Sequence, residues 1–327
     1  MNGHKLTQLL KIDYPFIQGG MARVATGLFA AQVSNAGALG VIGSGSMEAQ
    51  HLEAHIADCK AHLEEGRTWA VNLMMMNPHC DDLVDIIIRE RVPVVTTGAG
   101  SPSAYVERLQ AAGCQVWPVI ASPLMAKRMA RLGVDGLIVE GCEAGGHVGS
   151  FTSLALLPQV VTAVDLPVVA AGGIASGAQA LAVFAMGAVG IQLGTLLLAA
   201  EECPIHDNYR ARVLQAKIED VVTIGRIAGT ATQLLKNPMS RAYVKMERSG
   251  ADWEALERYS LGGLAKAVIE GDQDAGAMMV GQSVGLVQEV KPLAAIFADL
   301  MRDTDQAMRR LTDEWEAEGP WKSTDID

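Results

Sequence analysis

An apolar run meets a glycine-rich loop at Gly136-Leu-Ile-Val-Glu140-Gly-Cys-Glu-Ala-Gly-Gly-His147-Val-Gly149. Such a run is typical of a buried strand that ends in a loop at the rim of an α/β sheet or barrel. The glycines permit backbone angles closed to other residues and let a flat ligand approach the main chain. His147 can exchange a proton near neutral pH, and α/β barrels hold their catalytic groups at the carboxyl ends of strands. The alternative is that the glycines only form a turn and His147 is merely exposed.

The rest of the first two-thirds of the chain repeats this order of apolar run and helical pattern. Strands are predicted at residues 15–18, 39–43, 69–75, 92–97, 115–120, 136–140, 167–171 and 188–193. Helices are predicted between them at residues 25–35, 49–64, 103–112, 123–132 and 177–186. Eight alternations with short connections predict a closed parallel (β/α)8 TIM barrel. A doubly wound open sheet is the alternative, but no Gly-x-Gly-x-x-Gly fingerprint follows the first strand.

One segment imitates a membrane span. Residues 166–200 carry no charged side chain, and this length suffices to cross a bilayer. The segment also contains Pro167, six glycines and several polar residues, and its pattern changes from strand to helix and back. We therefore interpret it as a buried β-α-β unit.

The pattern changes after Cys203. Residues 204–281 are richer in charge, show helical segments and lack strand alternation. We expect them to form a helical lid that packs on the barrel, because no low-complexity linker would let it swing. The chain then returns into a long amphipathic helix from Pro292 to Glu318, followed by a polar tail. The predicted units are a barrel, a lid, and a return segment with its C-terminal helix, at residues 1–203, 204–281 and 282–327.

Composition excludes several classes of function. The 327-residue chain has a net charge of −11, which argues against general nucleic-acid binding because that needs a basic surface. Its five cysteines are scattered without a Cys-x-x-Cys pair, which supports neither a disulfide framework nor a zinc site. The first residues show no secretory signal pattern. We expect a cytoplasmic protein with no membrane anchor and no metal.

Two glycine-rich turns follow the last two predicted strands. Loops at this place in a barrel commonly bind a phosphate through main-chain N–H groups. Gly172 and Gly173 would supply amides from the first turn, and Gly194 with Thr195 would supply an amide and a hydroxyl from the second. Neither turn contains a lysine or arginine, so a phosphate would be held by dipoles. The alternative is that these glycines only close the strands.

Polar and apolar residues at the other strand ends add to the predicted site. Asn72 is an amide in an otherwise apolar strand. It either bonds neighbouring backbone or contacts the polar edge of a ligand such as a flavin ring. The methionines Met74, Met75 and Met76 are interpreted as core or as the lining of a substrate pocket.

Together the motifs resemble the nitronate monooxygenase (2-nitropropane dioxygenase-like) superfamily. They are Tyr14-Pro-Phe-Ile-Gln-Gly-Gly-Met-Ala22, Ala36-Gly-Ala-Leu-Gly40, Val71-Asn72, Val95-Thr-Thr-Gly-Ala-Gly100, the loop from Glu140 to Gly149, Ala170-Ala-Gly-Gly-Ile174 and Gln192-Leu-Gly-Thr195. Within the superfamily the chain is most similar to the flavin-dependent enoyl-acyl-carrier-protein reductases of type II, from about Leu9 to Leu286. Nitronate monooxygenases tend to have Gln-Ala-Pro-Met in place of Gln18-Gly-Gly-Met21, and they lack the run from Thr96 to Gly100.

The resemblance implies a barrel that binds flavin mononucleotide (FMN). The FMN phosphate would lie on Gly172, Gly173, Gly194 and Thr195. The other cofactor contacts that the resemblance implies are Gly19, Gly20, Met21, Asn72, Glu140, Gly145, Gln192, Met278 and Gln282. His147 matches the family's active-site histidine.

The implied reaction is reduction of a trans-2-enoyl thioester, on acyl carrier protein or coenzyme A, in fatty-acid elongation. NADH or NADPH would reduce the flavin, and the flavin would pass hydride to the substrate β-carbon. His147 would polarise the thioester carbonyl or supply the α-carbon proton. We also expect a homodimer. Docking of an acidic carrier on this acidic chain would need a basic patch; the candidates are Lys127-Arg128 with Arg131, or Arg226, Lys236 and Arg241 on the lid.

Two residues depart from the reductase pattern. Arg23 stands where an aromatic residue is usual, and Leu196 stands where an arginine usually follows the Gln-x-Gly-Thr motif. A nitronate monooxygenase, which would use the same histidine as base and O2 as oxidant, is the main alternative. A quinone reductase of the same superfamily is another. A flavin-free barrel that binds a sugar phosphate and a non-catalytic flavin protein are the remaining alternatives, and the colour of the purified protein separates these two.

Overall fold

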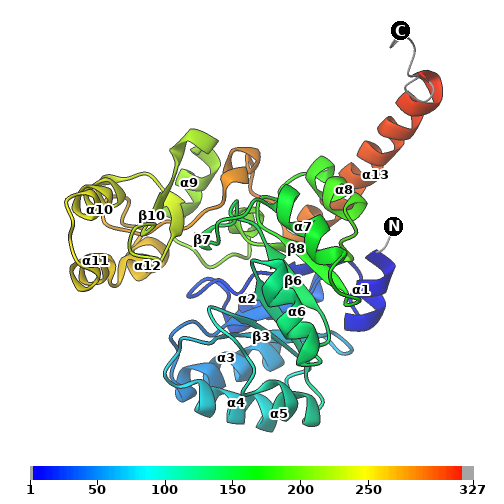
Figure 1. Cartoon of the computed structure of the whole chain (residues 1–327), viewed down its shortest axis with the longest axis horizontal. Coiled ribbons are helices and arrows are strands. Elements are labelled where there is room, and N and C mark those ends of the chain that lie inside the picture. Colours follow the sequence, from blue (N-terminus) through cyan, green and yellow to red (C-terminus); the bar gives the residue numbers. More distant parts are fainter. Residues whose placement is uncertain (1–2, 319–327) are drawn as a thin grey trace.

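Eight parallel strands form the centre of the computed structural model, which describes residues 3–318 (Figure 1). In the sheet they follow the order β1-β9-β8-β6-β5-β4-β3-β2, and a bridge between Ile17 and Leu39 links the two end strands. The barrel is therefore closed as predicted, and all eight predicted strands are confirmed. Their bounds are β1 (Phe16–Gln18), β2 (Gly40–Gly43), β3 (Trp69–Met74), β4 (Val94–Gly98), β5 (Gln115–Ile120), β6 (Leu137–Glu140), β8 (Val168–Ala171) and β9 (Gly190–Leu193).

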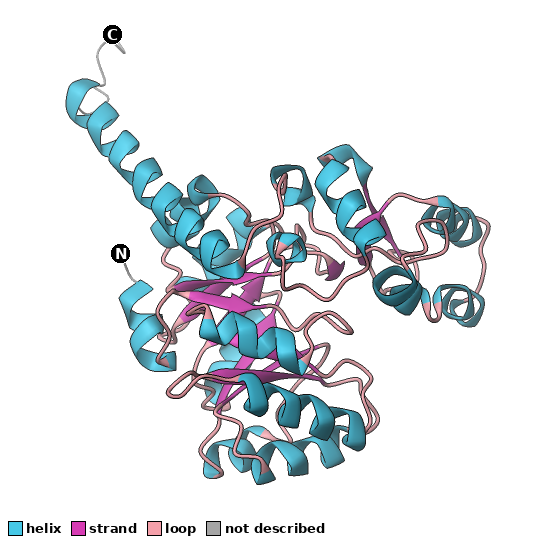
Figure 2. Ribbon diagram, turned by 180° about the vertical axis from the view of Figure 1, so that it is seen from behind, coloured by secondary structure: helices cyan, strands magenta, loops and turns pink. Residues whose placement is uncertain are grey.

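Helices surround this barrel (Figure 2). They are α2 (Gly27–Asn35), α3 (Ala49–His62), α4 (Cys80–Arg89), α5 (Val106–Ala111), α6 (Pro123–Arg131), α7 (Ser153–Val161) and α8 (Gly177–Ala185). The hydroxyls of Thr26, Ser122 and Ser176 accept hydrogen bonds from main-chain N–H groups of the first turns of α2, α6 and α8, which fixes where these helices begin. The sequence did not predict α4 or α7. The first lacks a side-chain cap and the second contains Pro158, so the usual boundary signals are weak.

The interior of the barrel is filled by side chains from alternate strand positions. Ile17, Val94, Trp117 and Ile138 are among them, and Trp117 is fully buried. A side chain at Gly136 would collide with the Trp117 ring, because a Cβ there would lie 2.2 Å from Cζ3. The short helix α1 (Gly3–Leu10) closes the amino-terminal end of the barrel with Leu6 and Leu10. Of the two ends of the barrel, only the carboxyl end is therefore open to a ligand.

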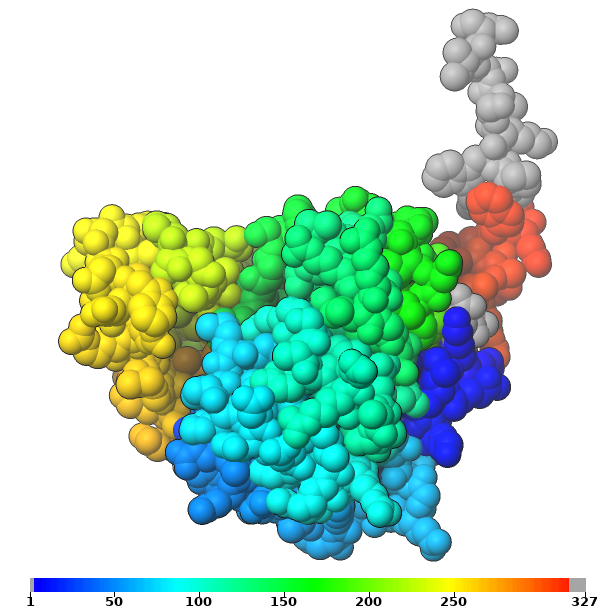
Figure 3. All heavy atoms as spheres, turned by 60° about the horizontal axis from the view of Figure 1, so that its bottom comes forward, coloured from blue at the N-terminus to red at the C-terminus, as the bar shows by residue number. Residues whose placement is uncertain are grey.

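The lid follows the 3-10 helix η1 (Thr195–Ala199) and is mainly helical, as predicted. Its helices are α9 (Asp207–Gln215), η2 (Ile218–Asp220), α10 (Pro238–Arg248), α11 (Trp253–Ser260), α12 (Gly263–Ala265) and η3 (Lys266–Glu270). It also contains a hairpin that the sequence did not predict, made of β10 (Val221–Ile224) and β11 (Thr232–Leu235). The short strand β7 (Gly146–His147) of the barrel loop pairs with β11. Lid and barrel therefore share one three-stranded antiparallel sheet, and they lie against each other in Figure 3.

The chain returns to the barrel through η4 (Gln282–Leu286) and ends in α13 (Leu293–Glu318), close to the predicted bounds. The first turns of α13 pack on α8, where Gly177 lets the two backbones approach: a Cβ there would lie 2.2 Å from the Asp303 carbonyl carbon. The later turns project from the body of the protein (Figure 1). The predicted polar tail lies outside the described residues.

The charge-free segment at residues 166–200 folds into β8, α8, β9 and η1, as the β-α-β interpretation predicted. Between residues 3 and 318, no helix combines the length and the apolar character that crossing a membrane requires.

Candidate active site

Polar side chains form the uppermost layer inside the barrel. Asn72, Thr96 and Glu140 each follow an inward-facing residue by two positions, and Gln192 pairs with the inward-facing Ile17, so all four face inward as well. The strand register places Gln192 beside Ala171 and Ala171 beside Glu140, and it places Asn72 beside Thr96. The interior thus changes from apolar to polar at the carboxyl ends of the strands, where the sequence predicted the site.

The loop after β1 lies against this layer. The side-chain amide of Asn72 donates to the Thr96 hydroxyl at 2.9 Å. A Cβ at Gly20 would stand 2.3 Å from Asn72 Cγ, so only glycine leaves room for that amide. Gly19 donates to the main-chain carbonyl of Leu193 at 2.8 Å, which ties the loop to the end of β9. The structure therefore brings Gly20 and Asn72 together, as the predicted site requires.

The Glu140 carboxyl group has no hydrogen-bond partner among residues 3–318, and the residue is partly exposed at the end of β6. Burial raises the pKa of Glu140 to about 8, so the group is mostly protonated at neutral pH. A neutral carboxyl group can both donate and accept a hydrogen bond, so it suits the polar edge of a ligand.

The turns after β8 and β9 present unpaired main-chain donors. The N–H groups of Gly172, Gly173, Gly194 and Thr195 have no acceptor within the part of the chain that the structure describes. Gly172 and Gly173 have φ of +91° and +73°, angles that favour glycine. A Cβ at Gly194 would meet only Met21 Sδ, at 3.8 Å, so open space lies in front of this turn. Such a set of amides suits a phosphate group.

The return segment braces both the phosphate turns and the histidine loop. The Ser283 hydroxyl donates to the Gly173 carbonyl at 2.5 Å, and the Gly281 amide donates to the Thr195 hydroxyl at 2.8 Å. The main-chain N–H of Gln282 donates to the main-chain carbonyl of Glu143 at 2.9 Å. Gly145 packs so closely that a Cβ there would lie 2.7 Å from the Val280 carbonyl carbon.

Three residues that the sequence analysis did not single out hold the histidine loop. The Glu143 carboxylate accepts from the Ser153 amide at 2.9 Å and from its hydroxyl at 3.0 Å. Gln233 donates to the Ala144 carbonyl at 2.6 Å and accepts from the Gln282 side chain at 3.2 Å. Of these three residues only Gln233 carries a signal in the sequence, because it is a polar residue in an apolar run; in the structure it is buried.

His147 lies at the mouth of the site on β7, opposite Thr232 of β11. Its side chain is exposed on one side, but the protein on its other sides lowers the pKa of the imidazole below its usual value. The ring is therefore neutral at physiological pH. No hydrogen bond to another side chain among residues 3–318 restrains it, so both ring nitrogens are available to a ligand.

Some predicted residues lie elsewhere. Met278 is only 1% exposed and packs in the core, while its neighbour Met279 approaches the histidine loop, with Sδ 3.5 Å from where a Cβ on Gly146 would stand. Met76 is 72% exposed. Arg23 is exposed in the left-handed region, with φ of +62°.

These features fit a flavin nucleotide. The unpaired N–H groups suit its phosphate, and the polar layer with its unpaired Glu140 carboxyl suits the hydrogen-bonding edge of its ring. Neutral His147 at the mouth suits a group that exchanges protons or polarises a substrate. Fold and site together define a flavin-dependent oxidoreductase built on a TIM barrel.

The chain belongs to the nitronate monooxygenase family, whose model matches residues 4–82 and 60–303. Its structure is similar to that of FabK from Thermotoga maritima, with a TM-score of 0.92 and 39% identity over 95% of this chain and 98% of that one. The chain is 28% identical to (3aS,4S,5R,7aS)-5-hydroxy-7a-methyl-1-oxo-octahydro-1H-indene-4-carboxyl-CoA dehydrogenase from Rhodococcus jostii, over 94% of this chain and 96% of that protein. It is also 28% identical to a probable nitronate monooxygenase from Staphylococcus aureus, over 94% of this chain and 99% of that protein.

Proposed function

We propose that the protein uses FMN and NAD(P)H to reduce the carbon–carbon double bond of trans-2-enoyl thioesters carried by acyl carrier protein or coenzyme A. The observation that carries this proposal is the similarity to FabK, the type II enoyl-acyl-carrier-protein reductase, over nearly the whole chain with the lid included. As part of the same proposal, the enzyme acts in the cytoplasm in fatty-acid elongation, and it works as a homodimer.

The residues that would hold FMN are those with unpaired polar groups. The amides of Gly172, Gly173, Gly194 and Thr195 would bind its phosphate. Asn72, Glu140 and Gln192 would bind the edge of its ring, beside Gly19, Gly20, Met21 and Gly145. When bound, FMN supplies the hydride transfer from the nicotinamide to the substrate β-carbon. Gln282, held by Gln233 and by the Cys142 carbonyl, would position the return segment over the cofactor rather than react.

His147 would act on the substrate carbonyl. A neutral imidazole holds one N–H, which can donate a hydrogen bond to the thioester oxygen and stabilise the negative charge that develops there as hydride reaches the β-carbon. Because burial keeps the pKa of His147 below its usual value, the protonated form needed to deliver the α-carbon proton is scarce at neutral pH. This favours the polarising role, with the proton taken from water at the open mouth.

A nitronate monooxygenase is the second candidate, favoured by the family match and by the Staphylococcus aureus relative. In that reaction neutral His147 would accept the proton from the carbon next to the nitro group. The lowered pKa keeps the imidazole neutral, as this role also requires. The two functions are therefore distinguished by which substrate the protein turns over.

The deciding experiment starts with anaerobic reduction of the purified protein by NADH or NADPH, followed through the loss of flavin absorbance. The reduced protein is then mixed with a crotonyl thioester, and in parallel the oxidised protein is given a nitroalkane in air. We expect rapid reduction by nicotinamide and rapid reoxidation by the thioester. Slow reduction by both nucleotides together with rapid oxygen consumption on the nitroalkane would overturn the reductase proposal.

A further inference from the structure

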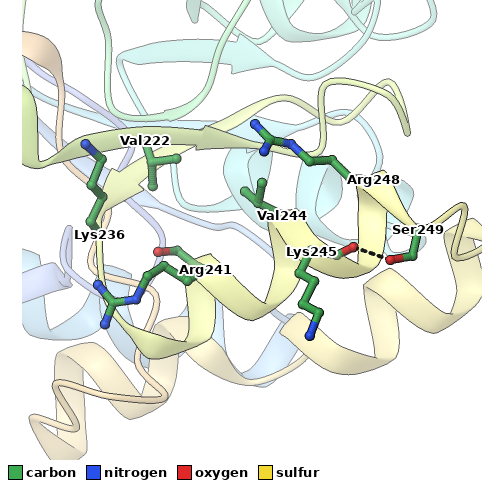
Figure 4. Close-up of a pocket in the computed structure, with 8 residues that line it drawn as sticks. Val222, Lys236, Arg241, Val244, Lys245, Arg248 and Ser249 are labelled. Carbon is green, nitrogen blue, oxygen red and sulfur yellow. Dashed lines mark hydrogen bonds between the residues drawn. The ribbon is translucent and has the colours of Figure 1, made fainter.

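The outer face of the lid carries a pocket of about 430 Å³ that the proposed chemistry does not use. Its lining residues are Val222, Lys236, Ser240, Arg241, Val244, Lys245, Arg248 and Ser249 (Figure 4). Four of these are basic and none is acidic. In a chain whose net charge is −11, this concentration of positive charge points to an anionic partner.

Within the described part of the chain, the four basic side chains have no acidic partner that would compete with such a ligand. All of them are exposed, and none forms an ion pair with another residue between positions 3 and 318. Arg241, Lys245 and Arg248 share one face of α10 because they are four and three residues apart. Lys236, at the end of β11, donates to the main-chain carbonyl of Glu219.

The floor of the pocket is apolar. Val222 of β10 and Val244 of α10 belong to the hydrophobic core of the lid. In Figure 4 the nitrogen ends of Lys236 and Arg248 lie on one side of the two valines, and those of Arg241 and Lys245 lie on the other. An apolar floor between two basic rims suits an amphipathic helix whose apolar side is flanked by acidic residues.

The pocket is connected to the active site through the shared sheet. Val222 pairs with Leu234 of β11, and Thr232 of the same strand pairs with His147. Two strand spacings, roughly 10 Å, therefore separate β10 from the strand of the histidine. The side chains of Val222 and His147 lie on the same face of this sheet, so a thioester arm of a partner bound at the pocket has only this width of sheet to cross.

We propose that this pocket docks the acidic helix of an acyl carrier protein. The inference rests on the proposed function, because only a thioester substrate arrives on such a carrier. It favours the lid over α6, the two places where the sequence offered a basic patch, but the pocket contains Lys236 and Arg241 of the predicted lid patch and not Arg226. Lys127, Arg128 and Arg131 lie in the second half of α6, and helices of a (β/α)8 barrel run from the rim toward its amino-terminal end, away from His147.

The test reverses charge at the pocket in an Arg241→Glu, Lys245→Glu double variant. The matched control is Lys127→Glu, Arg128→Glu on α6, which makes the same change of charge. At low salt we expect kcat/KM for crotonyl-loaded carrier protein to fall about tenfold or more in the pocket variant and to stay unchanged in the control. For crotonyl-CoA we expect both variants to match the wild type. Circular dichroism and flavin content establish that both variants are folded.

Three results would overturn the docking proposal. The pocket variant could lose activity equally with both thioesters, which would assign the pocket to a group that they share. The pocket variant could keep full activity with the carrier-bound thioester. Alternatively, the control variant on α6 could lose as much of that activity as the pocket variant does. Binding of crotonyl-loaded carrier is also measured without turnover, by fluorescence anisotropy. If the wild type reduces neither thioester, the proposed function fails; carrier binding that depends on Arg241 and Lys245 would still support docking, and its absence would overturn it.

Discussion

Replacing Gly194 by alanine should separate phosphate binding from the stability of the fold. A Cβ on Gly194 meets only Met21 Sδ, at 3.8 Å, and the φ of −123° lies outside the left-handed region that favours glycine. We therefore expect the free energy of unfolding to change by less than about 1 kcal/mol. The added methyl group would, however, stand in the open space beside the unpaired N–H groups of Gly194 and Thr195.

The expected loss of cofactor affinity follows from those N–H groups. A hydrogen bond from a main-chain N–H to a charged phosphate contributes about 1.5–3 kcal/mol. Loss of one such bond should raise the Kd for FMN about 10- to 150-fold. The assay titrates flavin-free protein with FMN, follows the quenching of flavin fluorescence, and measures thermal unfolding of the same samples.

Gly173→Ala is the contrasting variant. With φ of +73° and a Cβ that would lie 2.8 Å from Glu143 Cβ, it should lose about 1–2 kcal/mol of stability before any ligand is added. Wild-type affinity for FMN in Gly194→Ala would refute the phosphate placement. A loss of stability in Gly194→Ala as large as in Gly173→Ala would refute the reasoning about open space.

Three further predictions concern the site. His147→Ala should retain flavin but reduce the enoyl thioester about 10²- to 10⁴-fold more slowly in single-turnover mixing, and an unchanged rate would remove His147 from the mechanism. Because burial raises the pKa of Glu140 from 4.5 to about 8, the unfolding free energy of the flavin-free protein should fall as pH rises between those values. Solvent screening reduces the change in unfolding free energy that corresponds to this pKa shift to about 1–2 kcal/mol. Urea unfolding at several pH values should show that Glu140→Gln lacks this dependence on pH. Equal slopes in the wild type and the variant would contradict the assignment to Glu140. Gly173→Val should purify without flavin, so a fully loaded preparation would contradict the placement of the phosphate on the turn after β8.

The barrel could be predicted because its strands are buried on both faces. Residues 137–139 and 167–171 are continuous apolar runs with glycines close behind them, and this signal needs no tertiary information. The lid hairpin could not be found in the same way. Residues 221–224 and 232–235 are short and lie in a charge-rich region. They pair with each other, and residues 232 and 233 also pair with His147 and Gly146, which are far away in sequence.

The sequence predicts which loops form the candidate site, but it does not predict which way each side chain in those loops points. The carboxyl ends of parallel strands meet at one rim, so the glycine turns and Asn72 had to converge. Whether Met278 or Met279 faces the histidine loop depends on the bridge between Leu234 and Met279, a contact between remote segments. The support of the loop by Glu143 and Ser153 likewise depends on how α7 packs, and the sequence pattern does not predict that helix.

The strand that carries His147 has a consequence for engineering. Because β7 is hydrogen-bonded to β11, a chimera that takes residues 204–281 from a relative also replaces the strand that pairs with His147. Such a graft would change the position and the surroundings of His147 even with every barrel residue kept. A graft that is meant to leave His147 unchanged has to keep the register between Gly146 and Gln233 intact.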